Sequence, residues 1–476
     1  MSLIKYGGLL SMVVLFGAIY YRRSQDNQLR EQLDKVLENL RRAERKVSVP
    51  PRTRVAIGLG ACEDGFVSAI DLLNKLEIKP PAGVKHYGSI QGEKELAEMF
   101  AFFFSRGAAG ERYLHDKQLF EDILNVVEQD PSANWYTGGN APAMANRLAK
   151  EGCEVLLGAR MSQKLRDSLH ERIKVSVVGS PLKKDDVHLL MEYKTGEQWG
   201  PYVTPRANRF IIHSDSSNPK LESLDDFSEG LLAFHPQAVV IGGLQMMDNF
   251  PFLEGERHSR LAELQRVMAD LSPNTKTHFE FASFAEEAML HDLLEYVVPY
   301  SDSLGMNEQE LPNLFSLLAY GNVSVLSDPY PRTATVLDQM RFVFNSLKKT
   351  PLTDGRRKLS RLHVHTLAFQ AIMTSKGSGW KNTMSAAAKA ALTANRYVCG
   401  TSEVDISKSR IIMDDSFSIS QEVGSQRMPF RDDRPVSCWD EDDVRICVAP
   451  VLVCTDVYMT GGGGDNVSSA GLVLQI

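Results

Sequence analysis

Four glycines followed by an aspartate are the part of the sequence best suited to chemistry: Gly461, Gly462, Gly463, Gly464 and Asp465. The apolar stretch 446–453 predicts a buried strand before them, and a helix is expected to start after them. Glycine N–H groups approach a phosphate closely, and a helix N-terminus adds positive charge. Asp465 would then accept the proton of an attacking hydroxyl. The alternative is a flexible loop ending in an N-cap aspartate; a P-loop is excluded, because no Gly-Lys-Ser/Thr follows.

Two acidic motifs supply candidate ligands for a cation. In the alternating stretch 277–282, His278 and Glu280 share one face of a predicted strand. Asn307 and Glu310 precede an amphipathic helix, and their spacing also fits a capping box. A few carboxylates together with phosphate oxygens suit magnesium, so Glu280, Glu310 and Asp465 are the predicted metal residues. The alternatives are a solvated strand face for Glu280 and a helix cap for Glu310.

These motifs together resemble those of the ribokinase-like superfamily, and specifically its ADP-dependent sugar kinases. Gly462, Gly463, Gly464 and Asp465 match the G-x-G-D signature, in which the glycines bind phosphate and the aspartate is the catalytic base. His278 with Glu280 matches an H-x-E motif, and Asn307 with Glu310 matches N-x-x-E. The matches run in the family's order from about residue 50 to the end. The resemblance implies magnesium, ADP as phosphoryl donor, AMP as product and glucose as acceptor.

The resemblance also assigns a sugar-binding end. The family's N-A-x-x-D motif is matched at Asp64, although Gly60 stands where the family has asparagine. Further matches predict substrate contacts from Glu111, Gly138, Gly139 and Asn140. Taken alone, a single glutamate is usually a surface residue and Gly-Gly-Asn is often a turn with a helix cap. The segments 205–210 and 361–367 also look like family segments, but no catalytic role is assigned to their arginines or histidines.

Short apolar runs alternate with amphipathic segments through the body of the chain. Strands are predicted at 55–59, 155–157, 175–178, 210–213, 239–241, 278–282, 362–365 and 446–453, and helices at 141–151, 259–271, 284–297, 308–320, 333–348 and 381–396. This α/β pattern predicts a Rossmann-like, ribokinase-type fold with a central, largely parallel sheet flanked by helices. Segments within about 75–130 and 180–230 break the alternation and predict a smaller α/β lid.

Composition excludes some classes of function. The chain has 476 residues and a formal net charge of −7, which argues against a nucleic-acid partner. Its six cysteines show no zinc spacing. If the body lies in an oxidising compartment, the cluster of four after residue 398 is where disulfides are expected; otherwise the cysteines are buried thiols.

The N-terminus differs from the rest. Residues 6–21 are nearly all apolar and are flanked by Lys5, Arg22 and Arg23, so 1–23 is predicted to be a signal peptide or signal anchor. Residues 24–49 predict a linker helix, and 50–476 form the kinase domain. The expected location is the endoplasmic reticulum, in the lumen or anchored in the membrane, or outside the cell; the orientation is open. Asn466 begins one of the N-glycosylation sequons of the chain, and it is expected to carry no glycan because it adjoins the proposed active site.

The leading hypothesis is a monomeric kinase in which Asp465 deprotonates the glucose 6-hydroxyl for attack on the β-phosphoryl of Mg-ADP. A second hypothesis keeps the mechanism but changes the acceptor to another sugar, a sugar phosphate or a nucleoside. A third is a membrane-tethered protein that binds sugar and nucleotide without turnover.

Overall fold

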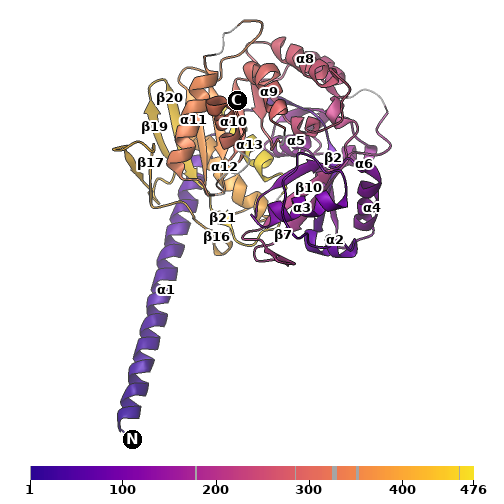
Figure 1. Cartoon of the computed structure of the whole chain (residues 1–476). Helices are drawn as coiled ribbons and strands as arrows, with labels where there is room; N and C mark the ends of the chain where they lie inside the picture. Colours follow the sequence, from indigo (N-terminus) through magenta and orange to yellow (C-terminus); the bar gives the residue numbers. More distant parts are fainter. Residues whose placement is uncertain are drawn as a thin grey trace.

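The computed structural model describes residues 2–176, 180–284, 286–323, 328, 330–349, 353–459 and 461–476, with side chains from residue 14 onward. The body contains a large and a small sheet that lie side by side, and one long N-terminal helix projects from it (Figure 1). The large sheet has ten strands and the small sheet has five.

The large sheet has the order β19-β20-β15-β14-β13-β12-β11-β1-β5-β6. Its strands are β1 (Arg54–Gly58), β5 (Glu154–Gly158), β6 (Ile173–Val175), β11 (Ala238–Ile241), β12 (Lys276–Glu280), β13 (Ser303–Asn307), β14 (Arg361–His365), β15 (Phe369–Ser375), β19 (Ser437–Glu441) and β20 (Val444–Pro450). The strands from β14 to β6 are all parallel, and β15, β20 and β19 add an antiparallel edge. The predicted largely parallel sheet is therefore confirmed.

Helices cover both faces of the large sheet. They are α5 (Asn140–Lys150), α6 (Gln163–Asp167), α7 (Leu224–Phe234), α8 (Glu256–Ala269), α9 (Glu287–Tyr296), α10 (Glu310–Tyr320), α11 (Thr333–Leu347), α12 (Thr383–Val398) and α13 (Gly463–Val473). One face packs on α7 to α11, through buried side chains such as Leu261 and Val336. The other packs on α5, α12 and α13, through side chains such as Met144 and Leu472. The amphipathic segments therefore form helices because each has one apolar face to bury.

The small sheet has the order β3-β10-β7-β2-β4 and forms the lid. Its strands are β2 (Cys62–Ser68), β3 (Gly110–Tyr113), β4 (Asn134–Gly138), β7 (Val187–Tyr193) and β10 (Asn208–His213), and its helices are α2 (Ala69–Lys75), α3 (Glu93–Phe104) and α4 (Lys117–Glu128). The helices bury an apolar core against one face of this sheet, with Leu72, Phe100 and Ile123 fully buried. Strands β3, β7 and β10 and helices α3 and α4 come from the segments 75–130 and 180–230, whereas β2, β4 and most of α2 lie outside them.

The remaining elements are short. They are β8 (Gln198–Trp199), β9 (Tyr202–Val203), β16 (Ser409–Arg410), β17 (Ser416–Ser418), β18 (Arg427–Pro429), β21 (Val453–Cys454) and the 3₁₀ turns at Asn218–Lys220, Leu244–Met247, Val298–Tyr300 and Ile406–Lys408. Two disulfides lie in the predicted cysteine cluster: Cys399–Cys454 joins the end of α12 to β21, and Cys438–Cys447 links paired residues of β19 and β20. Cys62 and Cys153 are buried free thiols.

Several predicted bounds differ from the structure. The strand expected at 210–213 belongs to the lid, because it pairs with β3 and β7. The strand expected at 446–453 ends at Pro450, and the one expected at 175–178 is seen only up to Val175, since residues 177 and 178 lie outside the described part.

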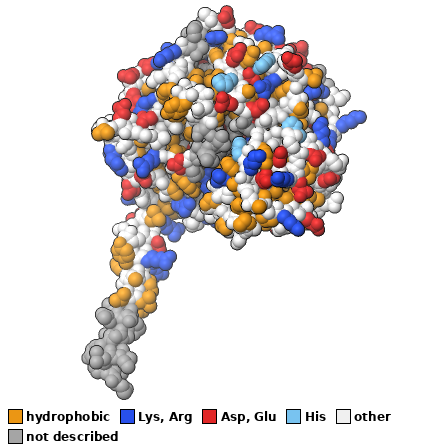
Figure 2. All heavy atoms as spheres, viewed as in Figure 1, with side chains coloured by type: hydrophobic (Ala, Val, Ile, Leu, Met, Phe, Trp, Pro, Cys, Tyr) orange, Lys and Arg blue, Asp and Glu red, His pale blue; other side chains and the backbone are white. Residues whose placement is uncertain are grey.

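The N-terminal segment forms one helix, α1 (Ser2–Glu44). Val14, Leu15, Phe16, Ile19, Tyr20 and Tyr21 are exposed on its projecting part, where Figure 2 shows hydrophobic side chains. From Leu33 onward the predicted linker helix packs against the body, because Leu33, Leu37 and Leu40 are buried in the core that also contains α12. Among the residues described, no helix carries an apolar stretch long enough to cross a membrane.

Candidate active site

A cavity of about 1030 Å³ lies between the large sheet and the lid. Its lining includes the predicted residues Asp64, Glu111, Gly138, Gly139, Asn140, Glu280, Glu310, Gly462, Gly464 and Asp465. Gly463 is described but does not line the cavity. Glu280, Asn307 and His365 are each the last residue of a parallel strand. The site therefore lies at the carboxyl ends of the strands, as expected for an open α/β sheet.

The glycine run forms the turn that starts α13. Gly462 is the N-cap, in the left-handed region with φ 68°, and Asp465 lies in the first helical turn. A Cβ on Gly461 would lie 2.8 Å from Cζ of Phe66 in the lid. Gly461 therefore lets the lid approach the turn, while the N-terminus of α13 directs its N–H groups and positive dipole toward the cavity. This arrangement supports the predicted anion-binding turn.

Asp465 is held by a neighbouring helix. Asn140, the first residue of α5, donates a 2.8 Å hydrogen bond from Nδ2 to Oδ1 of Asp465, and Gln245 donates a 2.6 Å bond to Asn140 Oδ1. Burial raises the pKa of Asp465 to about 7, and the nearby Glu280 acts in the same direction. A carboxylate with this pKa is well matched to accept a proton near neutral pH. Asn140, predicted as a substrate contact, thus orients the candidate base.

Glu280 is buried and fully hydrogen bonded. Its Oε2 lies 2.9 Å from His278 Nε2 and accepts a 2.5 Å bond from Ser468 of α13, while Oε1 lies 3.3 Å from His365 Nε2. Burial by itself raises the pKa of Glu280, but the bonds from His278 and His365 outweigh it and hold this pKa well below its usual range. The interpretation of 278–280 as a solvated strand face is therefore wrong.

Asn307 and Glu310 form a reciprocal pair. Asn307 Oδ1 accepts from Glu310 N at 2.9 Å, while Glu310 Oε2 accepts from Asn307 N at 2.8 Å. This is the hydrogen bonding of a capping box. Burial raises the pKa of Glu310 to about 8 and also raises that of Glu308, another cavity residue.

The predicted metal residues do not form a direct cage. Among the described His, Cys, Asp and Glu side chains, those of Glu280, Glu310 and Asp465 do not gather within 4.8 Å of one another. Magnesium keeps several water ligands and binds phosphate oxygens, so a water-mediated site still fits these carboxylates. The raised pKa values of Glu310 and Asp465 are consistent with positions where a cation would stabilise the charged forms.

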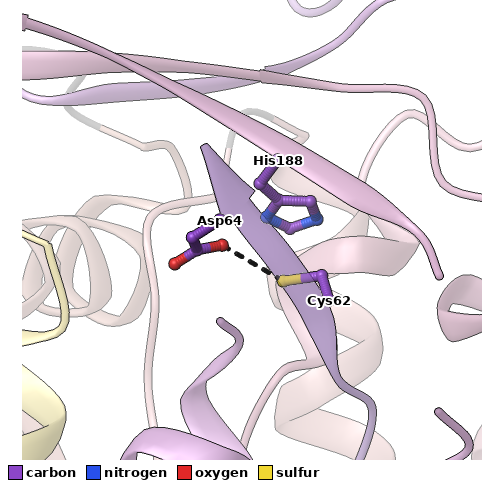
Figure 3. Close-up of side chains that lie close together, drawn as sticks. All are labelled: Cys62, Asp64 and His188. Atoms are coloured by element: carbon purple, nitrogen blue, oxygen red, sulfur yellow. Dashed lines mark hydrogen bonds between the residues drawn. The ribbon is translucent and has the colours of Figure 1, made fainter. Parts of the chain in front are cut away.

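The lid supplies the opposite wall. Asp64 and His188 are paired residues on β2 and β7, and Cys62 Sγ lies 3.3 Å from Asp64 Oδ1 (Figure 3). His188 Nδ1 lies 3.7 Å from Glu111 Oε1, and its Nε2 lies 3.0 Å from the buried Asp215. Burial raises the pKa of Asp64 to about 6, against the opposing charge of His188. These groups can accept or donate several hydrogen bonds to a polyol.

Gly60, where the family pattern has asparagine, adopts φ 82°, and a Cβ there would lie 3.0 Å from Oδ1 of Asn218. Asn218 is buried and bonds the backbone of Ala61 through both ends of its amide, with Nδ2 donating at 2.8 Å and Oδ1 accepting at 3.1 Å. The space beside Gly60 is therefore filled by another amide, and Asn218 does not line the cavity.

The sequence alone assigns no role to three residues that line the cavity, namely His188, Arg209 and His365. His365, in the family-like segment 361–367, is buried, and its Nε2 lies 3.3 Å from Oε1 of Glu280. His188 is a single histidine in the apolar strand β7, so the sequence around it carries no signal. Arg209 stands in the family-like segment 205–210, which was the available clue.

Comparison with known proteins agrees with this geometry. Residues 53–474 match the conserved region of ADP-specific phosphofructokinase/glucokinase. The chain is 34% identical over 424 residues to the ADP-dependent glucokinase of Bos taurus, covering 88% of this chain and 84% of that protein. It is 29% identical over 435 residues to the probable ADP-dependent glucokinase of Caenorhabditis elegans, with the same coverage of 88% and 84%.

Solved structures share the fold. A hypothetical ADP-dependent phosphofructokinase from Pyrococcus horikoshii aligns with a TM-score of 0.61 and 16% identity, over 90% of this chain and 98% of its own. An ADP-dependent kinase in complex with fructose 6-phosphate and ADPβS gives a TM-score of 0.63 and 16% identity, over 94% of this chain and 97% of its own. Because the conserved region matches nearly all of the folded body, this chain belongs to the ADP-specific phosphofructokinase and glucokinase family.

Proposed function

We propose that this protein transfers the β-phosphoryl group of Mg-ADP to the 6-hydroxyl of D-glucose, giving glucose 6-phosphate and AMP. The observation that carries the proposal is that Asp465, at the start of α13, lines the same cavity as Asp64 and Glu111 of the lid. A buried base and an anion-binding turn thus face a set of polyol-binding groups. Relatives named ADP-dependent glucokinase support this choice of donor and acceptor.

Asp465 acts as the general base. Asn140 holds Oδ1, and Oδ2 is assigned to the proton of the sugar hydroxyl. As that proton moves to Asp465, the hydroxyl oxygen forms a bond to the β-phosphorus, the bond from this phosphorus to the AMP oxygen breaks, and AMP leaves. Phosphoryl transfer depends mainly on the alignment of the reacting groups and on charge stabilisation. The hydrogen bond that fixes Asp465 therefore contributes alignment, and Asp465 itself contributes a base.

The turn at Gly462 and Gly464 would stabilise negative charge on the moving phosphoryl group through backbone N–H groups. Arg209, on strand β10 of the lid, lines the same cavity from the opposite wall and adds positive charge. Magnesium, when bound near Glu280, Glu310 and Asp465, would neutralise further charge on the phosphates. Glu280 would act mainly through water, because both of its oxygens already accept hydrogen bonds.

The lid end offers hydrogen-bond acceptors to a sugar. Asp64 and Glu111 line it, with Asp215 behind His188. The carboxylates of Asp64 and Glu111 can accept hydrogen bonds from sugar hydroxyl groups. Arg209 and His188 also line this end, so its charge alone does not choose between a sugar and a sugar phosphate. The relatives named ADP-dependent glucokinase are the reason to favour glucose over fructose 6-phosphate.

The test is a comparison of initial rates on glucose, fructose 6-phosphate and adenosine, each with ADP or ATP, measured by AMP or ADP release. The highest rate is expected for glucose with ADP. A higher rate with another acceptor would replace glucose in the proposal. Calorimetric binding of sugar and nucleotide without any product release would instead indicate a binding protein that lacks turnover.

For its location, we propose that residues 1–23 direct the chain to the endoplasmic reticulum membrane and that the enzyme is a monomer. The apolar run 6–21 and the exposed side chains of Val14, Phe16 and Tyr20 support a membrane contact. The two disulfides favour an oxidising compartment. Carbonate extraction of cell membranes should retain the full chain and release a variant lacking residues 1–23; release of both would contradict anchoring.

A further inference from the structure

The residue that follows the candidate base is fixed at both ends of its side chain. Asn466 Nδ2 donates a 2.9 Å bond to the carbonyl oxygen of Gly462, and Asn466 Oδ1 accepts a 3.1 Å bond from Arg147 Nε. Asn466 is 6% exposed. The side-chain amide of Asn466 therefore adds a second hydrogen bond to the carbonyl of Gly462, which also accepts the backbone N–H of Asn466 at 3.2 Å, and so fixes the first turn of α13.

Arg147 belongs to the same helix as the residue that holds the base. Asn140 and Arg147 are seven residues apart on α5, about two helical turns, so they lie on one face. Asn140 donates a hydrogen bond to Asp465, and Arg147 donates one to Asn466. One helix face thus fixes two consecutive residues of the catalytic turn.

Arg147 is itself held by a chain of charges with low exposure. Its Nη1 lies 3.3 Å from Glu151 Oε1, and Glu151 Oε2 lies 2.7 Å from Lys389 Nζ of α12. Lys389 Nζ lies 3.5 Å from Oε1 of Glu44, the last residue of α1. The exposed fractions of the four side chains are 18% for Arg147, 15% for Glu151, 12% for Lys389 and 12% for Glu44.

The far end of this chain is also anchored. Arg396 of α12 donates to both carboxylate oxygens of Glu44, at 2.8 and 3.1 Å. Positive and negative groups alternate from Arg147 to Arg396. Networks of shielded, alternating charges hold their members more firmly than single exposed pairs do.

From these contacts we propose that Arg147 is a positioning residue for the catalytic turn, and that Glu44 of α1 supports it through Lys389 and Glu151. The inference rests on the proposed kinase activity. It makes the end of the N-terminal helix part of the working enzyme, while the projecting part of α1 remains free for another role.

The test compares Arg147→Gln, Arg147→Lys and Glu44→Gln with the wild type. The matched control is Glu403→Gln, which removes a different ion pair of α1, the one between Arg41 and Glu403 with side-chain exposures of 29% and 61%. We expect Arg147→Gln to lower kcat about 10-fold with little change in KM for ADP or glucose, because a small displacement of the base misaligns the reaction. Arg147→Lys keeps the charge but not the fork that holds Asn466 and Glu151, so it should restore kcat only in part.

Glu44→Gln should lower kcat about 3-fold and speed amide hydrogen exchange in a peptide covering 461–466, whereas Glu403→Gln should change neither. Melting temperatures of all variants identify any that fail to fold. An inactive wild type would refute the proposed function. An active wild type with an Arg147→Gln effect confined to KM for ADP, or with Glu44→Gln indistinguishable from Glu403→Gln, would overturn this inference alone.

Discussion

The carboxylate of Asp64 occupies the space next to Gly138 where any other residue would place its side chain. A Cβ on Gly138 would lie 1.9 Å from Asp64 Oδ1 and 2.1 Å from its Cγ. The two residues lie on the adjacent strands β2 and β4. Gly138 is therefore needed so that Asp64 can point into the cavity.

Replacing Gly138 should weaken sugar binding. In Gly138→Ala the new methyl group must displace the Asp64 carboxylate, so KM for glucose is expected to rise about 10-fold or more, with a smaller effect on KM for ADP. Steady-state kinetics with each substrate varied would measure this. Gly83→Ala is the control, since a Cβ there meets nothing within 4 Å. An unchanged KM for glucose in Gly138→Ala would mean that Asp64 does not contact the sugar.

The buried pair of His188 and Asp215 predicts a pH-dependent stability. Burial by itself lowers the pKa of His188, but Asp215, Glu111 and Asp64 raise it from 6.5 to about 10. His188 therefore stabilises the fold below its unfolded pKa of 6.5, and this contribution declines between pH 6.5 and about 10. Asp215, whose pKa is lowered, contributes stability that is lost only at strongly acidic pH.

The loss of melting temperature in Asp215→Asn should accordingly be largest near pH 6 and smaller near pH 10. Thermal melts at several pH values would measure it. Asp433→Asn, which breaks an exposed pair with Arg431 at side-chain exposures of 57% and 54%, should cost little at any pH. If the loss of melting temperature in Asp215→Asn stayed constant from pH 6 to 10, the protonation of His188 beside Asp215 would not be coupled to folding.

Much of this fold could be predicted, because its strands are short apolar runs and its helices are amphipathic. The glycine turn at Gly462 was predictable for the same reason, since a strand, a turn and a helix are consecutive in the chain. The strand β13 was missed, because Ser303 to Asn307 contains Gly305 and precedes a helix cap. The structure explains that glycine: a Cβ on it would lie 2.1 Å from Oε2 of Glu280 on the neighbouring strand.

Contacts between distant segments could not be predicted from local pattern. The lid sheet pairs β2 with β7, so Asp64 meets His188 across more than a hundred residues of sequence. No periodicity encodes that pairing, and no strand is predicted from the sequence at Val187–Tyr193, where β7 lies. The same holds for Arg147 and Asn466, whose contact joins residues 319 positions apart.

Glycosylation offers a test of the placement of α13. Asn466 is buried and uses both ends of its amide, so it should carry no glycan even when the chain is made in the secretory pathway. Asn322, the asparagine of the other sequon, is exposed and serves as the internal comparison. Peptide mapping of active enzyme that found a glycan on Asn466 would contradict the observed packing of this helix.

The strongest test of the mechanism is Asp465→Asn. The substitution keeps the size of the side chain and a partner for Asn140, but the amide cannot accept the hydroxyl proton, so kcat should fall by about 10²-fold or more. Because Asp465 has a pKa near 7 in the free protein, wild-type kcat/KM should also fall as the pH drops below 7, and this acid limb should vanish in the variant's residual activity. Asp456→Asn, at an exposed position that pairs with Lys408, is the control and should keep the wild-type rate and profile. If Asp465→Asn released AMP with an unchanged kcat, Asp465 could not be the base. Another residue would then have to accept the proton of the sugar hydroxyl.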